Sequence, residues 1–212
     1  MSRAAGVARI AAVGTIGLAY ACLAHYTNTT DTGGAGALCA LAPIAIGALV
    51  LAWRARQRLL AMSLVLAACA AAVLALPLLQ RHTSMIYWFE HAATQSLLCV
   101  AFARTLAPGR EPMVSAFARM VHGGLGPEMV RYTRQVTVAW SIFFGAMALV
   151  STVVFFGAPV AVWSTFANFF TAPLIVLMFV AEYAVRRRVL PDMDHATIIE
   201  GVQAFWKTTP GK

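Results

Sequence analysis

Two ionisable residues, Glu90 and His91, interrupt an apolar stretch, and their side chains are suited to proton transfer or to binding a polar group. An ionisable group inside a bilayer costs about 2.5 kcal/mol or more, so it usually faces a bundle interior or a cavity. His25 and Asn168 lie near the ends of other apolar stretches, and Gln95 lies one helical turn after His91. These five residues predict an outward-facing polar cavity. The pattern favours a simpler alternative, in which Glu90 and His91 touch interfacial water and only bond neighbouring helices.

The sequence around these residues contains no established catalytic or metal-binding motif. His122 is not followed by the H-x-x-x-x-D spacing of intramembrane acyltransferases, and neither G-x-S-x-G nor H-E-x-x-H is present. His25 and His91 lack the spacing of a haem or metal site, and the four cysteines lie singly inside apolar stretches. We therefore expect no cofactor and no metal, and the sequence favours a non-enzymatic protein over an enzyme.

The composition indicates a membrane protein. Of the 212 residues, 60% are hydrophobic and 11% are charged, and the mean hydropathy is +0.75. Soluble domains have about 45–50% apolar and about 25% charged residues. A soluble fold could not cover this much apolar surface, whereas lipid solvates the outer faces of membrane helices. We expect an all-α, polytopic integral membrane helix bundle.

Six apolar stretches approach the ~20 residues that a helix needs to cross the hydrocarbon core. They cover residues 6–26, 35–53, 59–79, 85–102, 136–156 and 160–185. The fourth is the least apolar. The stretches follow one another closely, so we expect one transmembrane domain over residues 1–212, ending in a cytoplasmic tail at 186–212.

The distribution of arginine and lysine predicts the orientation. Basic residues gather before the first stretch, after the second, between the fourth and fifth, and after the sixth, whereas the loops on the other side contain only Arg81. Such residues favour the cytoplasmic side, so both termini are expected in the cytoplasm. Four tryptophans near predicted span ends agree with this, since indole rings prefer the membrane interface. They are Trp53, Trp88, Trp140 and Trp163.

The loop between the fourth and fifth stretches has its own helical pattern. Met113, Val114, Phe117, Met120 and Val121 form one apolar stripe, which predicts a helix at about 111–122 lying on the inner membrane surface. A proline at 127 is placed to start a helix that continues into the fifth span. The tail carries a similar stripe over residues 198–205, which predicts a short amphipathic helix.

Arginines near the predicted inner face are candidates for docking. Their positions in short gaps between apolar runs are typical of topology signals and anionic head-group contacts, and not of nucleic-acid binding. The alternative is an acidic cytoplasmic partner, such as an acyl carrier protein or a peripheral biosynthetic enzyme. The candidates are Arg119, Arg131, Arg134, Arg186, Arg187 and Arg188.

Three segments resemble an uncharacterised family of proteobacterial inner-membrane proteins of this size. They are Phe-Ala-Arg-Thr-Leu-Ala-Pro-Gly-Arg-Glu-Pro at 102–112, Arg-Tyr-Thr-Arg-Gln-Val-Thr-Val-Ala-Trp-Ser-Ile-Phe-Phe at 131–144, and Met-Phe-Val-Ala-Glu-Tyr at 178–183. Members of that family tend to be encoded beside fatty-acid-type and aryl-polyene synthesis enzymes. The resemblance implies a bacterial inner-membrane location and a role in making or moving an acylated lipid or pigment. It implies no catalytic residue.

Three functions remain open from the sequence. The first is a non-enzymatic membrane scaffold or lipid-handling subunit of a lipid or polyene pathway. The second is a small transporter or proton-coupled carrier that uses Glu90 and His91. The third is a membrane enzyme that acts on a lipid-linked acyl group.

Overall fold

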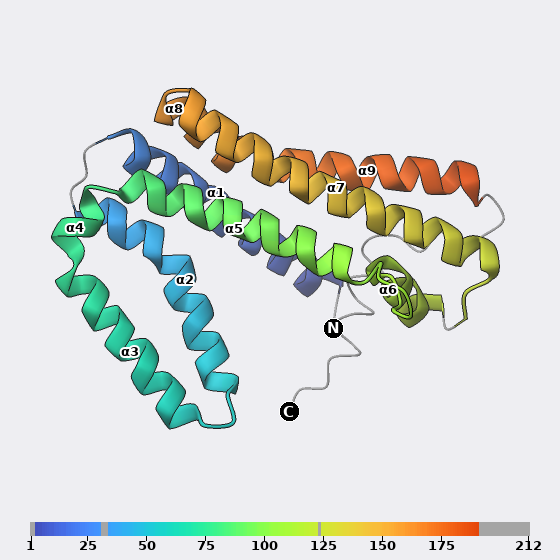
Figure 1. Cartoon of the computed structure of the whole chain (residues 1–212), viewed down its shortest axis with the longest axis horizontal. Helices are drawn as coiled ribbons and strands as arrows, with labels where there is room; N and C mark the ends of the chain where they lie inside the picture. The colour runs from blue at the N-terminus through green and yellow to red at the C-terminus, as the bar shows by residue number, and fades with distance from the viewer. Residues whose placement is uncertain (1–2, 31–33, 123, 191–212) are drawn as a thin grey trace. The chain divides into compact units, whose positions relative to one another are not determined.

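The computed structural model describes residues 3–30, 34–122 and 124–190, and every regular element in these ranges is a helix (Figure 1). The all-α prediction is thus confirmed. The helix expected at 198–205 lies outside the described residues. The elements are α1 (Arg3–Thr29), α2 (Gly34–Arg54), α3 (Arg58–Leu74), α4 (Leu76–Gln80), α5 (Thr83–Arg104), α6 (Met113–His122), α7 (Pro127–Gly157), α8 (Val160–Thr165), the π-helix η1 (Phe166–Phe170) and α9 (Thr171–Val189).

Within the described residues, three helical stretches are long and apolar enough to cross a membrane. They are α2, α7 and the continuous stretch Val160–Val189, which contains α8, η1 and α9. Helices also cover the other three predicted spans, but the count of six spans and the orientation stay predictions. The helix predicted to start at 127 and run into the fifth span is observed as α7.

The chain forms two compact units, which we describe separately. The first unit contains residues 1–91 and 151–171, and the second contains 92–150 and 172–212. Each unit combines an earlier and a later part of the chain, and α5 and α7 each contribute to both. The expectation of a single transmembrane domain stays a prediction.

The core of the first unit is small and aromatic. Ala24 of α1, Ala40 of α2, Tyr87 of α5 and Trp163 of α8 are buried together. Because alanine has a short side chain, α1 and α2 can approach the two large rings closely. The Tyr87 hydroxyl lies 2.9 Å from Thr27 Oγ1, so the polar end of this buried ring has a partner on α1.

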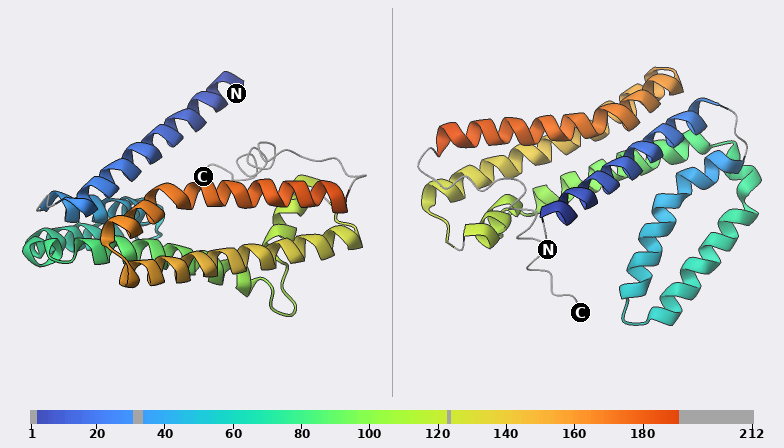
Figure 2. Two further views of the ribbon diagram at one scale, coloured as in Figure 1. Left: turned by 90° about the horizontal axis from the view of Figure 1, so that it is seen from above. Right: turned by 180° about the vertical axis from the view of Figure 1, so that it is seen from behind.

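The second and third helices form an antiparallel hairpin (Figures 1 and 2). The predicted single helix at 59–79 is wrong, because α3 ends at Leu74 and α4 begins at Leu76 with Pro77 in its first turn. A proline has no N–H for the preceding turn, so it fits best in the first turn of a helix. The start of α2 also packs tightly on α4. A Cβ on Gly34 would lie 2.8 Å from Leu76 Cδ2, so a larger residue there would make the Leu76 side chain shift.

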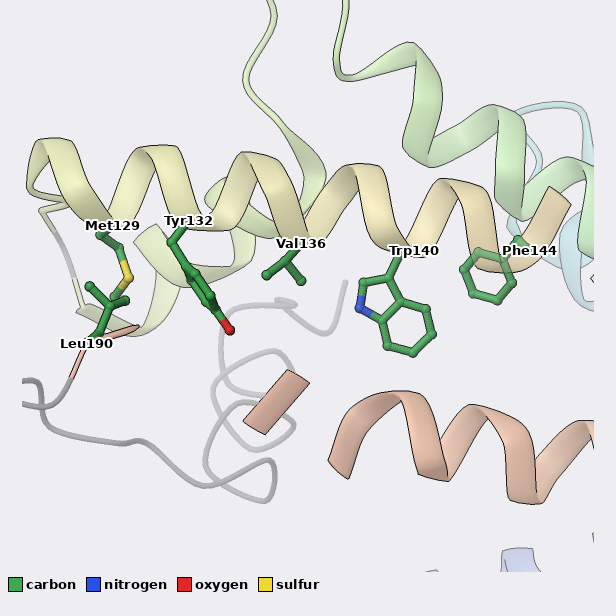
Figure 3. Close-up of a cluster of buried hydrophobic side chains, with 6 residues drawn as sticks. All are labelled: Met129, Tyr132, Val136, Trp140, Phe144 and Leu190. Atoms are coloured by element: carbon green, nitrogen blue, oxygen red, sulfur yellow. The ribbon is translucent and has the colours of Figure 1, made fainter. Parts of the chain in front are cut away.

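The core of the second unit lies along one face of α7 (Figure 3). Met129, Tyr132, Val136, Trp140 and Phe144 recur every three or four residues, which places them on the same side of the helix. Leu190, just after α9, closes the cluster beside Met129. This face of α7 meets α9, which runs antiparallel to it, so the start of α7 and the end of α9 lie at one end of the unit (Figures 1 and 2).

An aromatic group fixes the middle of this core. The Trp140 ring centroid lies 4.7 Å from that of Phe179 on α9 and 5.3 Å from that of Phe144. Trp140 is also 6.3 Å from Phe102 at the end of α5. Such offset and tilted arrangements are favourable beyond the area they bury.

The four tryptophans near predicted span ends differ in exposure. Trp53 is exposed, but Trp140 and Trp163 are buried inside their units. The indole N–H of Trp163 has an acceptor there, as described below. Their placement at a membrane interface stays a prediction, since burial against a neighbouring helix does not report depth in a bilayer.

Candidate functional site

His91 is the centre of a hydrogen-bonded network in the first unit. Its Nδ1 lies 2.9 Å from Ser151 Oγ on α7, and its Nε2 lies 3.0 Å from Thr171 Oγ1 at the start of α9. The indole Nε1 of Trp163 on α8 donates to Ser151 Oγ at 3.0 Å. One imidazole on α5 therefore connects three other helical segments.

One arrangement of protons satisfies this network. The indole N–H can only donate, so Ser151 Oγ accepts from Trp163. Among the hydrogen bonds of the described residues, the acceptor for the Ser151 hydroxyl proton is Nδ1 of His91. Nε2 then carries the proton and donates to Thr171 Oγ1, whose hydroxyl points to the Phe166 carbonyl at 3.5 Å. In this arrangement the hydroxyl, indole and imidazole protons form one directed chain, through which His91 bonds α5 to α7 and to the start of α9.

His25 forms a second polar contact in the same unit. Its Nδ1 lies 3.0 Å from Ser164 Oγ on α8. The amide nitrogen of Asn168 donates to the same hydroxyl at 3.1 Å and to the Ser164 carbonyl at 2.9 Å. The Phe169 ring meets the His25 ring edge-on at 5.3 Å. His25 and Asn168, predicted to line one site, thus share a single serine.

The π-helix η1 positions part of this contact, since it contains Asn168 and Phe169. Pro173 follows within the first turn of α9. A proline ring clashes with the carbonyl four residues earlier, here that of Phe169, and supplies no N–H to it. A locally widened turn relieves that crowding, and π-turns inside helices are often found at functional sites. The sequence analysis treated 160–185 as one regular helix and missed this change.

Glu90 differs from the adjacent His91 in its polar contacts. It is half-buried, and within the described residues its carboxylate takes part in no hydrogen bond or ion pair. It lies close enough to Tyr20 of α1 to act on that hydroxyl electrostatically. Tyr20 is in turn 3.5 Å from the Cys39 carbonyl.

The structure groups four of the five predicted cavity residues in one unit. His25, Glu90, His91 and Asn168 belong to the first unit, whereas Gln95 belongs to the second. Three partners of the histidine network were not singled out from the sequence, namely Ser151, Trp163 and Thr171. Serine and threonine are common in apolar helices, so their types alone gave no signal.

A second candidate site is the basic end of the second unit, which is organised around α6. Its first two backbone N–H groups, those of Met113 and Val114, have no acceptor in their own helix. Met113 donates to Thr105 Oγ1 at 2.9 Å, and Val114 donates to Thr137 Oγ1 of α7 at 3.2 Å. One residue later, the Ser115 hydroxyl bonds that of Thr133 at 2.6 Å. Hydroxyl groups from the turn after α5 and from α7 therefore cap α6 and fix it on α7.

This docking leaves part of the apolar stripe of α6 uncovered. Ser115, on the other side of the stripe, is buried against α7, whereas Phe117 and Met120 are 43% and 53% exposed. The exposed pair is suited to contact with lipid at an interface. The predicted loop helix is observed from Met113, and its position on a membrane surface stays a prediction.

All six candidate docking arginines belong to the second unit. Arg119 pairs with Glu111 at 2.8 Å, and Arg134 donates to the Leu106 carbonyl at 3.1 Å. Arg186 lies 3.6 Å from Glu182, four residues earlier on α9. The remaining three have exposed side chains and are Arg131, Arg187 and Arg188.

We expect Thr137→Val to loosen α6, because the variant keeps the shape of the side chain but removes the acceptor of the Val114 N–H. An unsatisfied buried donor costs about 1–3 kcal/mol. Hydrogen exchange of the amides in 113–122 should accelerate, while amides elsewhere in the unit keep their rates. Ser141→Ala is the matched control, since the Ser141 hydroxyl bonds only a carbonyl of its own helix. Equal exchange in both variants would contradict the capping role.

No protein-family model, curated protein or solved structure matches the chain. What the two sites can do therefore rests on their own geometry. The histidine network occupies both nitrogens of His91 in bonds between helices. The basic end of the second unit presents exposed, fixed positive charge, which suits the binding of anionic groups.

Proposed function

We propose that this chain is a six-span protein of the bacterial inner membrane, with both termini in the cytoplasm, that serves a lipid or polyene pathway without catalysing a step. It would hold a peripheral enzyme or an acyl carrier protein at the membrane, or handle a lipid. The observation that carries the proposal is the α6 platform, by which we mean α6 fixed on α7 together with the exposed arginines of this end. The resemblance to membrane proteins encoded beside acyl and polyene synthesis enzymes agrees with this role.

The arrangement of α7 and α9 supports placing this charge on one side of the membrane. The two helices are antiparallel, so Arg131 and Arg134 near the start of α7 lie at the same end as Arg186–Arg188 of α9 (Figure 1). A hydrogen bond joins α7 and α9 at this end, since the Tyr132 hydroxyl donates to the Glu182 carboxylate at 3.1 Å. Arginine prefers the cytoplasmic side, so this end is proposed to face the cytoplasm.

Rigid positive charge favours an acidic partner. The backbone of a mobile loop loses conformational entropy when the loop binds, whereas a helical backbone has lost that freedom beforehand, so only the arginine side chains remain to be ordered. A basic surface also accelerates association with an acidic protein, and this effect weakens as salt rises. An acyl carrier protein, acidic and carrying an acyl chain, has the chemistry that a basic surface beside a membrane would recognise.

The test is binding of a purified acyl carrier protein to this chain in nanodiscs. The triple variant Arg131→Gln, Arg187→Gln and Arg188→Gln is expected to weaken binding about tenfold, because each exposed ion pair contributes up to about 1 kcal/mol. Raising the ionic strength from about 0.01 to 0.15 M should weaken the native complex, since the Debye length falls from about 30 to 8 Å.

The matched control removes the same charge elsewhere. Arg54→Gln, Arg56→Gln and Arg58→Gln neutralise three exposed arginines that are predicted on the same side but belong to the first unit. That variant should bind like the native protein. Equal weakening in both triple variants would indicate non-specific attraction and contradict a docking role for this surface.

One observation favours the second candidate, a proton-coupled carrier. Glu90 is a half-buried carboxyl that no hydrogen bond or ion pair neutralises within the described residues, and such groups mark ion pathways in membrane proteins. A carrier should lose function on Glu90→Gln and tolerate the triple arginine variant. A scaffold should show the opposite.

A further inference from the structure

An apolar groove runs along the junction of α7 and α9 in the second unit. It has a volume of about 230 Å³. Its walls include Val136 and Ala139 of α7 and Met178, Ala181 and Val185 of α9. Two alanines on facing helices leave room that larger side chains would fill, so the groove follows from these short residues.

The two ends of the groove differ in chemistry. At the end near the start of α7, Tyr132 and Glu182 form part of the wall and bond each other. From Tyr132 to Ala139 the groove spans seven residues, or about 10 Å at 1.5 Å per residue. Trp140 and Phe179, whose ring centroids are 4.7 Å apart, lie next to Ala139 and Met178 in the chain, beside the apolar part of the groove. The groove therefore extends from a polar end into a purely apolar region.

Positive charge is in excess at the polar end. On the first turns of α7 and the last turns of α9, five arginines face two glutamates, which leaves a net charge of +3. Arg186 follows Val185, which lines the groove, and its Nε lies 3.6 Å from Glu182 Oε1, which also belongs to the wall. This Nε is buried and has no hydrogen-bond partner among the described residues. The Arg186 guanidinium is thus positioned beside the polar end of the groove.

We propose that this groove binds one acyl chain of a phospholipid with a net negative head group, whose phosphate lies at Arg186. The inference deepens the lipid-handling role and rests on the proposed membrane placement of α7 and α9. The whole groove, about 10 Å long, is a third of the ~30 Å hydrocarbon core, so it takes the part of one chain next to the head group. Basic pockets between membrane helices at the cytoplasmic side are the sites where anionic head groups bind.

Photo-crosslinking on the native chain tests this directly. The protein is placed in phosphatidylcholine nanodiscs that contain a minor fraction of phosphatidylglycerol with a diazirine on its acyl chain. Adducts are expected at 132–139 and 178–185, about fivefold above those at Ile142 and Leu149, which are exposed on other faces of α7. A diazirine phosphatidylcholine should not show this preference. Adducts spread evenly, or equal for both lipids, would overturn the proposal.

Filling the groove provides the second measurement. The double variant Ala139→Leu and Ala181→Leu should reduce the adducts at 132–139 and 178–185 to the level at Ile142, whereas Ala184→Leu, an exposed position on α9 outside the groove, should leave them unchanged. Arg186→Gln should abolish the preference for the anionic lipid. An unchanged pattern in the double variant would overturn the proposal. Adducts that appear only after residues 191–212 are removed would also overturn the proposal, because this segment, and not a lipid, would then occupy the groove of the full chain.

The outcomes separate this inference from the proposed function. Groove-specific adducts combined with no acyl carrier binding would retain the lipid site and reject the scaffold. Carrier binding that depends on Arg131, Arg187 and Arg188, combined with evenly spread adducts, would do the reverse.

Discussion

Replacing His91 with alanine is expected to lower the free energy of unfolding by about 2 to 4 kcal/mol. The variant removes both bonds of the imidazole and leaves a space where the ring was. It also leaves the Ser151 hydroxyl proton and the Thr171 hydroxyl without their partner on α5. Hydrogen bonds between membrane helices are individually modest, about 0.6 kcal/mol on average, so most of the loss comes from the empty space and the orphaned groups.

The measurement is unfolding in mixed micelles at increasing sodium dodecyl sulphate. His82→Ala is the control, because His82 lies on an exposed turn and its side chain takes part in no hydrogen bond among those of the described residues. His91→Asn, which retains a polar atom near the Nδ1 position, should recover part of the loss. A His91→Ala protein as stable as His82→Ala would mean that the network contributes nothing to the fold.

Replacing Trp140 with alanine is expected to cost about 3 to 5 kcal/mol. Its ring contacts Phe144 on its own helix (Figure 3) as well as Phe179 on α9 and Phe102 of α5. The variant therefore opens a space at the meeting point of three helices. Lipid tails are as apolar as the lost contacts, yet they cannot enter a small closed space. The dispersion contacts around that space are therefore lost outright.

Trp53→Ala is the matched control for this variant. Trp53 is 62% exposed, and its one recorded ring contact is with Arg58, 4.5 Å from the ring centroid. An exposed cation–π contact contributes about 0.5 to 1 kcal/mol. Comparable losses in the two variants, measured by the same mixed-micelle unfolding, would contradict the central place of Trp140 in the second unit.

Most helices could be predicted from the sequence, because apolar runs and their breakers determine them locally. Pro127 starts α7 as expected, and the stripe from Met113 marks α6. The break at Ala75 and the π-helix before Pro173 were missed. Both depend on how a proline is accommodated within an apolar run, and hydropathy does not report backbone hydrogen bonds.

The candidate site was predictable only in part. Strongly polar side chains stand out in an apolar stretch, so His25, His91 and Asn168 could be selected. Their partners could not, since Ser151 and Thr171 resemble other hydroxyl residues in these helices. The sequence also ranked a role as a bond between helices above a cavity. The structure places both ring nitrogens of His91 in contacts with other helices, and the choice between the two roles stays a prediction.

The interleaved units have a consequence for biosynthesis. His91 is separated from its partner Thr171 by 80 residues, and His25 from Ser164 by 139. At about 5 to 20 residues per second, the ribosome makes His25 about 7 to 28 s before its serine. The first unit therefore cannot be completed until residues 151–171 have been synthesised, and these follow the first part of the second unit, residues 92–150. Until then its histidines lack the hydroxyl partners that they have in the folded protein.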